Sequence, residues 1–258
     1  VTKVFGNLPY YITSPIIEKL LTTNGLRPTA IVLTVQKEFA QRIVAKPGTK
    51  DYSSFSKNGT VDGATYNNTG GFNGYGAYQF DGVNDRINIS DDTINAFAFN
   101  GTTNFTAVMW VKPNGGGSQH LVARRSTAGY ILMINVAQNH PDFYTDDAVG
   151  DNQNCLFSPG IANNTWSHLA YRWNGTHKDV FIKGVEGSIF SCVANGAYAA
   201  GITRWYASGL DLTVGMSSSK GNFFNGSLDD LNIYNRSLTT KEIVKIYQNR
   251  TDLIDSPS

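Results

Sequence analysis

The sequence predicts a mainly β protein, an antiparallel sandwich, that follows a short α/β segment. From Asn58 onward, short β-prone runs are separated by turns rich in Gly, Asn, Ser and Thr, which is typical of antiparallel sandwiches. Before that point, strand and helix patterns alternate around one continuous apolar run, as in a doubly wound α/β fold. Composition divides the chain at the same place, because 23 of the 26 glycines lie after residue 56.

The first 56 residues predict strand, helix, strand and helix in that order. A strand at Lys3–Phe5 leads into a tight turn over residues 6–10. Ser14-Pro15 then opens a helix, with Ser as the N-cap and Pro in the first turn. Residues 30–35 form a strand buried on both faces, and the second helix stops at Pro47-Gly48.

The remaining residues predict a series of short strands and one closing helix. Alternation of apolar residues predicts strands over 86–89, 105–111, 130–136, 166–173, 180–183, 210–214 and 228–233. The spacing of Thr239 and Glu242 is that of a capping box, and it predicts the start of a helix.

Charge also differs between the two parts. Residues 1–56 hold seven Lys and Arg against three Asp and Glu, a balance of +4, whereas the rest holds fourteen against seventeen, a balance of −3. No run of about 18 apolar residues occurs, so the sequence predicts no membrane span. No signal peptide is visible, but the chain begins at Val1 rather than Met, and we expect its natural N-terminus to lie upstream.

The second part is rich in Asn-x-Ser/Thr sequons. It holds ten of them, where its composition gives roughly four by chance, and the first 56 residues hold none. A secreted glycoprotein explains the excess, and an Asn-rich β protein that forms sequons incidentally is the alternative. The glycosylation candidates are Asn88, Asn104, Asn174 and Asn225.

The two cysteines, Cys155 and Cys192, also lie in the second part. A disulfide between them would fit an oxidising compartment. Two unpaired buried thiols are the alternative.

Polar clusters offer few site candidates. Asp81, Asn84 and Asp85 share one turn, where their oxygens could bind calcium. The alternative is that Asp81 and Asp85 accept hydrogen bonds from the turn backbone. We expect the acidic residues between 142 and 151 to form a solvated loop. His168 is expected to pack within a strand rather than bind a metal. Four aromatic residues in loop-like stretches could stack on sugar rings or pack the rim: Trp205, Tyr206, Phe223 and Phe224.

The N-terminal strings "VFGNLPYYITSPIIEKLL" and "VLTVQKEFAQRIVAKPGTKDYSS" resemble the rRNA adenine N6-dimethyltransferase family. The resemblance implies a catalytic motif at Asn7, Leu8, Pro9 and Tyr10, which directs acceptors at the base amine and stacks an aromatic ring on a flipped base. It also implies a cytoplasmic parent that uses S-adenosylmethionine and rRNA. No Gly-rich cofactor loop precedes Asn7, so we expect this chain to be inactive as a methyltransferase.

The later strings "GAYQFDGVNDRINI", "FTAVMWVKP", "WSHLAYRWNGTHKDVFIKGV" and "FNGSLDDLNIYNRSLTTKEIVKIYQ" resemble laminin-G-like, concanavalin A-like jelly-roll domains. The resemblance implies an extracellular or cell-surface module that binds glycans or a surface protein. It also places Asp230 in the penultimate strand, where its carboxylate could join the calcium candidates. The paired carboxylates of glycan-cleaving relatives are missing, so we expect no glycosidase activity.

The sequence thus divides into a methyltransferase fragment at 1–56, a jelly-roll domain at 57–250 and a tail at 251–258. The two resemblances overlap at the short word Lys50–Ser54, and no Pro-, Ser- or Gly-rich linker separates the parts. We therefore hypothesise a chimera whose working part is the binding module. A real fusion whose enzyme part has decayed is the alternative origin. The alternative function is an rRNA adenine dimethyltransferase fragment.

Overall fold

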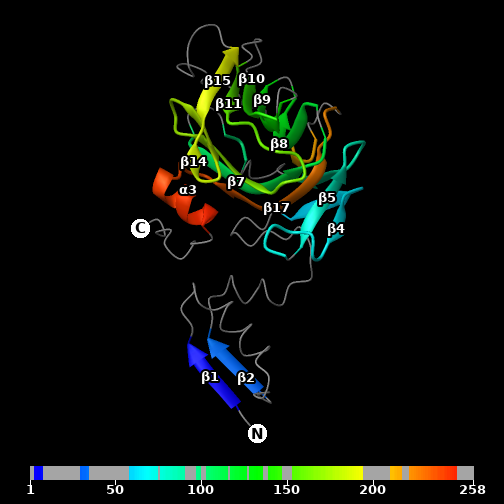
Figure 1. Cartoon of the computed structure of the whole chain (residues 1–258), viewed down its shortest axis with the longest axis vertical. Helices are drawn as coiled ribbons and strands as arrows, with labels where there is room; N and C mark the ends of the chain where they lie inside the picture. Colours follow the sequence, from blue (N-terminus) through cyan, green and yellow to red (C-terminus); the bar gives the residue numbers. More distant parts are fainter. Residues whose placement is uncertain are drawn as a thin grey trace.

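The computed structural model describes residues 3–7, 30–34, 58–74, 76–90, 97–99, 103–115, 117–126, 128–135, 139–146, 153–193, 210–216 and 221–248. From Gly59 to Tyr234 the described strands form two antiparallel sheets that pack face to face (Figure 1). This arrangement confirms the predicted jelly-roll sandwich. The predicted domain boundary at 56/57 lies outside the described residues.

One sheet has eight strands in the order β15-β11-β10-β9-β8-β16-β6-β3. Their bounds are β3 Gly59–Asp62, β6 Arg86–Ile89, β8 Gln119–Arg125, β9 Gly129–Ile134, β10 Pro141–Asp146, β11 Gln153–Ser158, β15 Ser188–Val193 and β16 Leu212–Val214.

The other sheet has seven strands in the order β14-β13-β12-β7-β17-β5-β4. Their bounds are β4 Thr65–Asn67, β5 Ala77–Asp81, β7 Phe105–Pro113, β12 Ser167–Trp173, β13 Lys178–Ile182, β14 Val185–Glu186 and β17 Asn225–Tyr234.

The core lies between the two sheets and is built from alternate residues of each strand. Large side chains such as Phe105 and Phe143 are completely buried there. Burying a side chain of this size stabilises the fold by about 2 kcal/mol. Tyr171 is also buried, and its hydroxyl donates to the carbonyl of Met133 at 2.9 Å, which ties one sheet to the other.

Helix α3, Thr240–Tyr247, covers the outer face of the seven-stranded sheet (Figure 1). It begins with the predicted capping box: Thr239 Oγ1 accepts from the Glu242 backbone N–H, and Glu242 Oε2 accepts from the Thr239 backbone N–H at 2.7 Å. Ile243 then packs against Val108 and Phe181 of the sheet.

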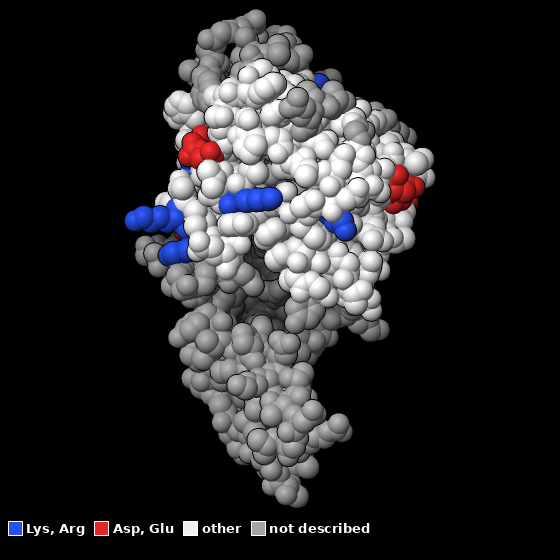
Figure 2. Space-filling view, in the orientation of Figure 1, with Lys and Arg blue, Asp and Glu red and all other residues white. Residues whose placement is uncertain are grey.

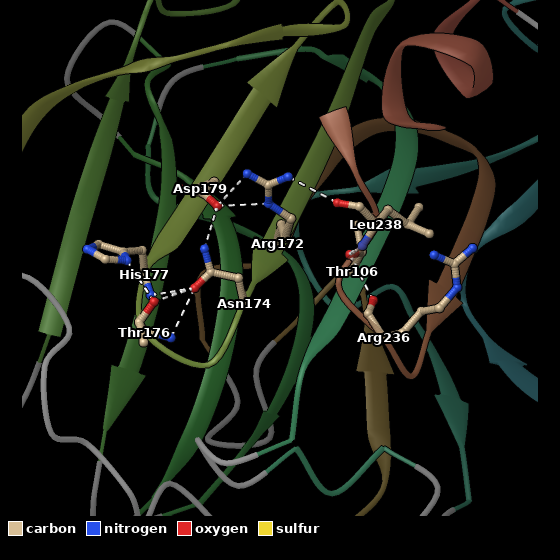
Figure 3. Close-up of polar contacts among 8 residues, drawn as sticks. All are labelled: Thr106, Arg172, Asn174, Thr176, His177, Asp179, Arg236 and Leu238. Carbon is tan, nitrogen blue, oxygen red and sulfur yellow. Dashed lines mark hydrogen bonds and ion pairs between the residues drawn. The ribbon is translucent and has the colours of Figure 1, made fainter. Parts of the chain in front are cut away.

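A polar network anchors the segment that leads into α3 (Figure 3). Thr106 Oγ1 donates to the carbonyl of Arg236 at 3.0 Å and accepts from the Leu238 N–H at 2.9 Å. Arg172 Nη1 donates to the carbonyl of Leu238 at 3.0 Å, while its Nε donates to Asp179 at 2.8 Å. Strands β7 and β12 therefore fix where the helix starts.

In the N-terminal part, β1 Lys3–Asn7 and β2 Ala30–Thr34 pair in parallel. A parallel pair needs a crossover connection, as in an α/β unit, so both predicted strands are confirmed. The two predicted helices lie outside the described residues.

The acidic stretch after residue 141 departs from expectation. Asp142 and Asp146 lie in β10 and are 0% and 4% exposed, so the prediction of a solvated loop was wrong for both. Asp147 and Asp151 lie outside the described residues. The stretch is a strand rather than a loop because β10 pairs with β9 on one side and β11 on the other.

We predict that Glu242→Gln lowers the free energy of unfolding by about 1 kcal/mol at neutral pH, because it removes the charged partner of Arg236 while keeping the cap. The hydrogen bonds from Arg236 hold the pKa of Glu242 at about 2, below its usual 4.5. This contribution is therefore complete above pH 4.5 and is lost as the pH falls through about 2.

Urea unfolding across this pH range measures the effect. The control is Glu186→Gln, since Glu186 is exposed on β14. An equal effect of the two substitutions would contradict the assigned role of Glu242.

Candidate functional site

The outer face of the eight-stranded sheet, the face turned away from the core, carries an ordered set of polar and aromatic side chains. Strand pairing places His120, Met133, Asp142 and Leu156 in one row across β8, β9, β10 and β11. The next row holds Ala123, Ile131, Tyr144 and Asn154. Ala123, Ile131 and Met133 form an apolar cluster that is separate from the main core.

Arg125, Tyr144 and Asp146 form one hydrogen-bonded group on this face. Arg125 Nη2 donates to Asp146 Oδ2 at 2.5 Å and to the Tyr144 hydroxyl at 3.2 Å, and that hydroxyl donates to Asp146 Oδ2 at 3.2 Å. The guanidinium also lies 5.0 Å from the centre of the Tyr144 ring. The Arg125 side chain is 23% exposed, so the group is accessible from one side.

Asp142 is the most strongly perturbed carboxyl group of the site. Burial raises its pKa to about 7, although the amide of Asn135, which donates to Oδ2 at 3.2 Å, and the charge of Lys178 oppose the shift. Lys178 reaches from β13 to donate to the carbonyl of Phe143 at 3.2 Å, and burial lowers its pKa to about 7.

Several buried polar atoms on the outer face have no hydrogen-bond partner in this structure. They are His120 Nδ1, Arg125 Nε, Asp142 Oδ1 and Asn154 Oδ1. An unsatisfied buried polar atom costs about 1–3 kcal/mol, and proteins keep such atoms mainly where water or a ligand meets them. These four atoms belong to side chains of β8, β10 and β11, on the outer face of the eight-stranded sheet.

His120 is neutral at ordinary pH. Burial, together with the positive charge of Arg125, lowers its pKa to about 4. Asn222, in the segment before β17, lies beside it, with the Asn222 Nδ2 and His120 Nε2 atoms 3.3 Å apart. A neutral ring offers one donor and one acceptor, so it can pair with a hydroxyl.

The predicted calcium residues are not gathered into one site. Asp81 Oδ1 accepts from the backbone of Val83 at 2.7 Å, and Asp85 Oδ2 accepts from the backbone of Asp81 at 2.8 Å. Asp81 is paired with Asn225 at the start of β17, whereas Asp230 lies five residues further along that strand, at its bulge. Among the described residues, no group of three or more His, Cys, Asp or Glu side chains is arranged to hold a metal ion.

In the turn itself, Asp81 and Asp85 accept hydrogen bonds from the backbone, which agrees with the alternative interpretation of the sequence. Hydrogen bonds from that backbone, led by the Val83 N–H, lower the pKa of Asp81. Calcium binding here stays a prediction.

The predicted stacking residues need one correction. Phe224 is completely buried and lies 5.7 Å from Phe80, ring centre to ring centre, so it belongs to the core and cannot stack on a ligand. Its neighbour Phe223 is half-buried, while Trp205 and Tyr206 lie outside the described residues. The aromatic residue that does face outward among the polar groups is Tyr144. In the sequence, the polar or amphipathic residues Asp142, Tyr144 and Asp146 alternate with Phe143 and Thr145. This period of two could have predicted that β10 is a strand with Tyr144 on its polar face.

The predicted cysteine pair lies at the edge of the same sheet. Cys155 of β11 is disulfide-bonded, and the backbone of Cys192, the chain's other cysteine, is directly opposite it on β15. In the N-terminal part, Asn7 ends β1, and Leu8, Pro9 and Tyr10 lie outside the described residues.

Comparison with known families gives two matches. Residues 81–244, more than half of the chain, match the concanavalin A-like lectin/glucanases superfamily. The chain belongs to this superfamily. Residues 2–60 match the ribosomal RNA adenine dimethylase family, which confirms the resemblance of the N-terminal part to rRNA adenine dimethyltransferases.

Two curated relatives match the N-terminal part of this superfamily member. The ribosomal RNA small subunit methyltransferase A of Geobacillus sp. strain WCH70 is 58% identical over 53 residues, which is 20% of this chain and 18% of that protein. A probable dimethyladenosine transferase of Caenorhabditis elegans is also 58% identical over 53 residues, 20% of this chain and 17% of that protein. The chain therefore spans about a fifth of the length of these relatives.

Solved structures match the sandwich. The binding domain of Paraclostridial Mosquitocidal Protein 1 has a TM-score of 0.60 at 16% identity, covering 78% of this chain and 49% of that one. Domain 4 of AbnA, a GH43 extracellular arabinanase from Geobacillus stearothermophilus solved in complex with arabinotriose, has a TM-score of 0.56 at 16% identity, covering 78% and 93%. At these identities the likeness shows the fold. The described residues contain no helix long and apolar enough to cross a membrane.

We predict that the stability of the wild type relative to Asp142→Asn falls as the pH rises from about 4 to about 7. Because the folded state raises the pKa of Asp142, the native carboxyl is favoured below its usual pKa of 3.8 and is penalised once the unfolded chain can ionise. We expect a relative loss on the order of 3 kcal/mol, measured by denaturant unfolding at several pH values. A difference between the two proteins that stays constant with pH would contradict the burial of this charge.

Proposed function

We propose that the sandwich is a glycan-binding module whose ligand lies on the outer face of the eight-stranded sheet, against Arg125, Tyr144 and Asp146. The observation that carries the proposal is the hydrogen-bonded group of Arg125, Tyr144 and Asp146, in which the Arg125 side chain is 23% exposed. Carbohydrate hydroxyls both donate and accept, so a sugar ring can pair with the guanidinium of Arg125, whose side chain is partly exposed.

Charge on this face favours an uncharged sugar. Arg125 and Asp146 neutralise one another, and His120 is neutral at ordinary pH because its pKa is about 4. The half-buried ring of Tyr144 offers an apolar surface next to these polar groups. Neutral oligosaccharides combine apolar C–H patches with hydroxyls in the same way.

A nucleic-acid partner for the sandwich is less well supported. Binding of phosphate backbones requires clustered Lys and Arg side chains. On the face drawn in Figure 2, Lys and Arg side chains lie near one another only at the left edge, with acidic side chains close by, and most of the described surface is uncharged. The net balance of residues 57–258 is −3, which also disfavours this partner.

We propose an extracellular or cell-surface location for this module. The disulfide of Cys155 supports it, since disulfides persist in oxidising compartments. The partner is then a glycan or glycoconjugate outside the cell, with a surface protein as the alternative. The extracellular arabinanase domain with bound arabinotriose provides a first sugar to test.

Residues 2–60 support a second proposed function, which belongs to the intact methyltransferase from which this fragment would derive. With 58% identity to methyltransferase A over 53 residues, we propose that the intact parent dimethylates rRNA adenine in the cytoplasm with S-adenosylmethionine. Asn7, Leu8, Pro9 and Tyr10 would hold the base there. Since cytoplasmic rRNA and extracellular glycans do not meet, a chimera of two genes is our account of the fusion.

The glycan proposal is tested by screening the full chain on an array of neutral oligosaccharides that includes arabinotriose. We expect Tyr144→Ala to weaken binding of the best ligand by about tenfold or more, which corresponds to about 1.4 kcal/mol of lost contact. The matched control is Tyr66→Ala, since Tyr66 is 40% exposed on β4 of the other sheet. Equal affinity of both variants would show that the ligand binds elsewhere, and no bound sugar at all would overturn the proposal.

A further inference from the structure

Three sequon asparagines lie together at one end of the sandwich. Strand pairing places Phe105 opposite Trp173 and Thr106 opposite Tyr234. Asn104 directly precedes β7, and Asn174 and Asn235 directly follow β12 and β17. The three side chains therefore stand at the ends of three adjacent strands, although they are far apart in sequence.

The surroundings of these asparagines leave room for an attached sugar. Asn104 and Asn235 are exposed. Asn174 is half-buried, and its Nδ2 donates a long hydrogen bond of 3.5 Å to Asp179, whose carboxylate is already paired with Arg172 at 2.8 Å. Replacing one N–H of that amide by a sugar therefore costs little.

The side-chain oxygen of Asn174, rather than its nitrogen, makes the hydrogen bonds that stabilise the turn after β12 (Figure 3). Asn174 Oδ1 accepts from the backbone N–H of Thr176 at 3.0 Å, from its hydroxyl at 2.9 Å and from the N–H of His177 at 2.8 Å. Since an N-linked sugar attaches to Nδ2, a glycan leaves these three bonds intact. The neighbouring turn touches this one, because a Cβ at Gly175 would lie 2.9 Å from Asn104 Oδ1.

Two other sequons differ. Asn88 lies inside β6, paired with Thr60 of β3 on one side and Thr213 of β16 on the other. Its row continues across the sheet through Ala123 and Ile131 to Tyr144, so it belongs to the proposed ligand face.

Asn225 is crowded as well. It begins β17 and takes part in two backbone hydrogen bonds: its N–H donates to Gln119 Oε1 at 2.9 Å, and its carbonyl accepts from Asn114 at 2.8 Å. A Cβ atom added at Gly82 would lie 2.7 Å from the Cβ of Asn225, so the turn at Gly82 closely approaches the start of β17.

We infer that Asn104, Asn174 and Asn235 carry N-linked glycans that cover this end of the sandwich, while Asn88 and Asn225 stay unmodified. The inference rests on the export proposed above. It keeps two of the four sequence-based candidates, removes Asn88 and Asn225, and adds Asn235. Glycans at this end leave the row from Asn88 to Tyr144 uncovered, so modification and ligand binding use different surfaces.

The test is to express the full chain behind a heterologous signal peptide in secreting animal cells. Peptide N-glycosidase F digestion in heavy-oxygen water then marks each occupied asparagine as a labelled aspartate. We expect label at Asn104, Asn174 and Asn235, and none at Asn88 and Asn225. Label at Asn88 or Asn225 in the secreted, folded protein, or no label at the three end positions, would overturn the inference.

Variants assign the glycans one by one. Asn104→Gln, Thr176→Ala and Ser237→Ala should each remove one glycan and increase gel mobility by one step. Thr106 is left unchanged, because its hydroxyl holds the Arg236–Leu238 segment. Asn88→Gln and Asn225→Gln are the controls and should leave mobility unchanged. Ligand binding by the enzymatically deglycosylated chain is measured separately, so failure of the glycan-binding proposal and failure of this inference can be told apart.

Discussion

Each sheet of a two-layer sandwich has two faces, and packing the sheets together buries only one face of each. The second face has to be covered by another element, exposed to water, or used. In this protein the two sheets solve the problem differently. Helix α3 covers part of the seven-stranded sheet, whereas the outer face of the eight-stranded sheet carries polar groups. The proposed function follows from that difference.

Placement of the helix depends on a few polar contacts with the sheet below it. Thr106 and Arg172 bind the backbone of the segment that precedes the helix, and Arg236 binds Glu242 within its first turn. Val108, Ala170 and Phe181 then meet Leu238 and Ile243 in a second, smaller core. On the other sheet, Ala123, Ile131 and Met133 supply an apolar floor, around which Arg125, Asp142 and Tyr144 stand.

Local pattern was sufficient to predict several elements. The strand at Arg86–Ile89 and the capping box at Thr239 are set by alternation and by spacing over a few residues, and both occur as predicted. Both N-terminal strands were predictable for the same reason. The fold class followed from turns and strand lengths that repeat along the chain.

The candidate site could not be predicted in this way, because it depends on which strands become neighbours. Asp142 and Asp146 belong to an acidic stretch that resembles a loop, and only pairing with β9 and β11 places them in an interior strand. Phe224 belongs to an aromatic pair in a polar segment, and only the packed structure shows that it contacts Phe80. Asp230 was grouped with Asp81 by family resemblance, while the register of β17 separates them.

Methyl NMR of the full chain tests the central claim, that the ligand lies on the outer face of the eight-stranded sheet. The chain has three methionines, so labelling their methyl groups gives three assignable signals. Met133 belongs to the outer-face cluster, whereas Met109 lies in the core between the sheets. On titration with the oligosaccharide that binds best, we expect the Met133 signal to shift in a saturable way and the Met109 signal to stay in place. Saturable binding that leaves Met133 unmoved would contradict the account.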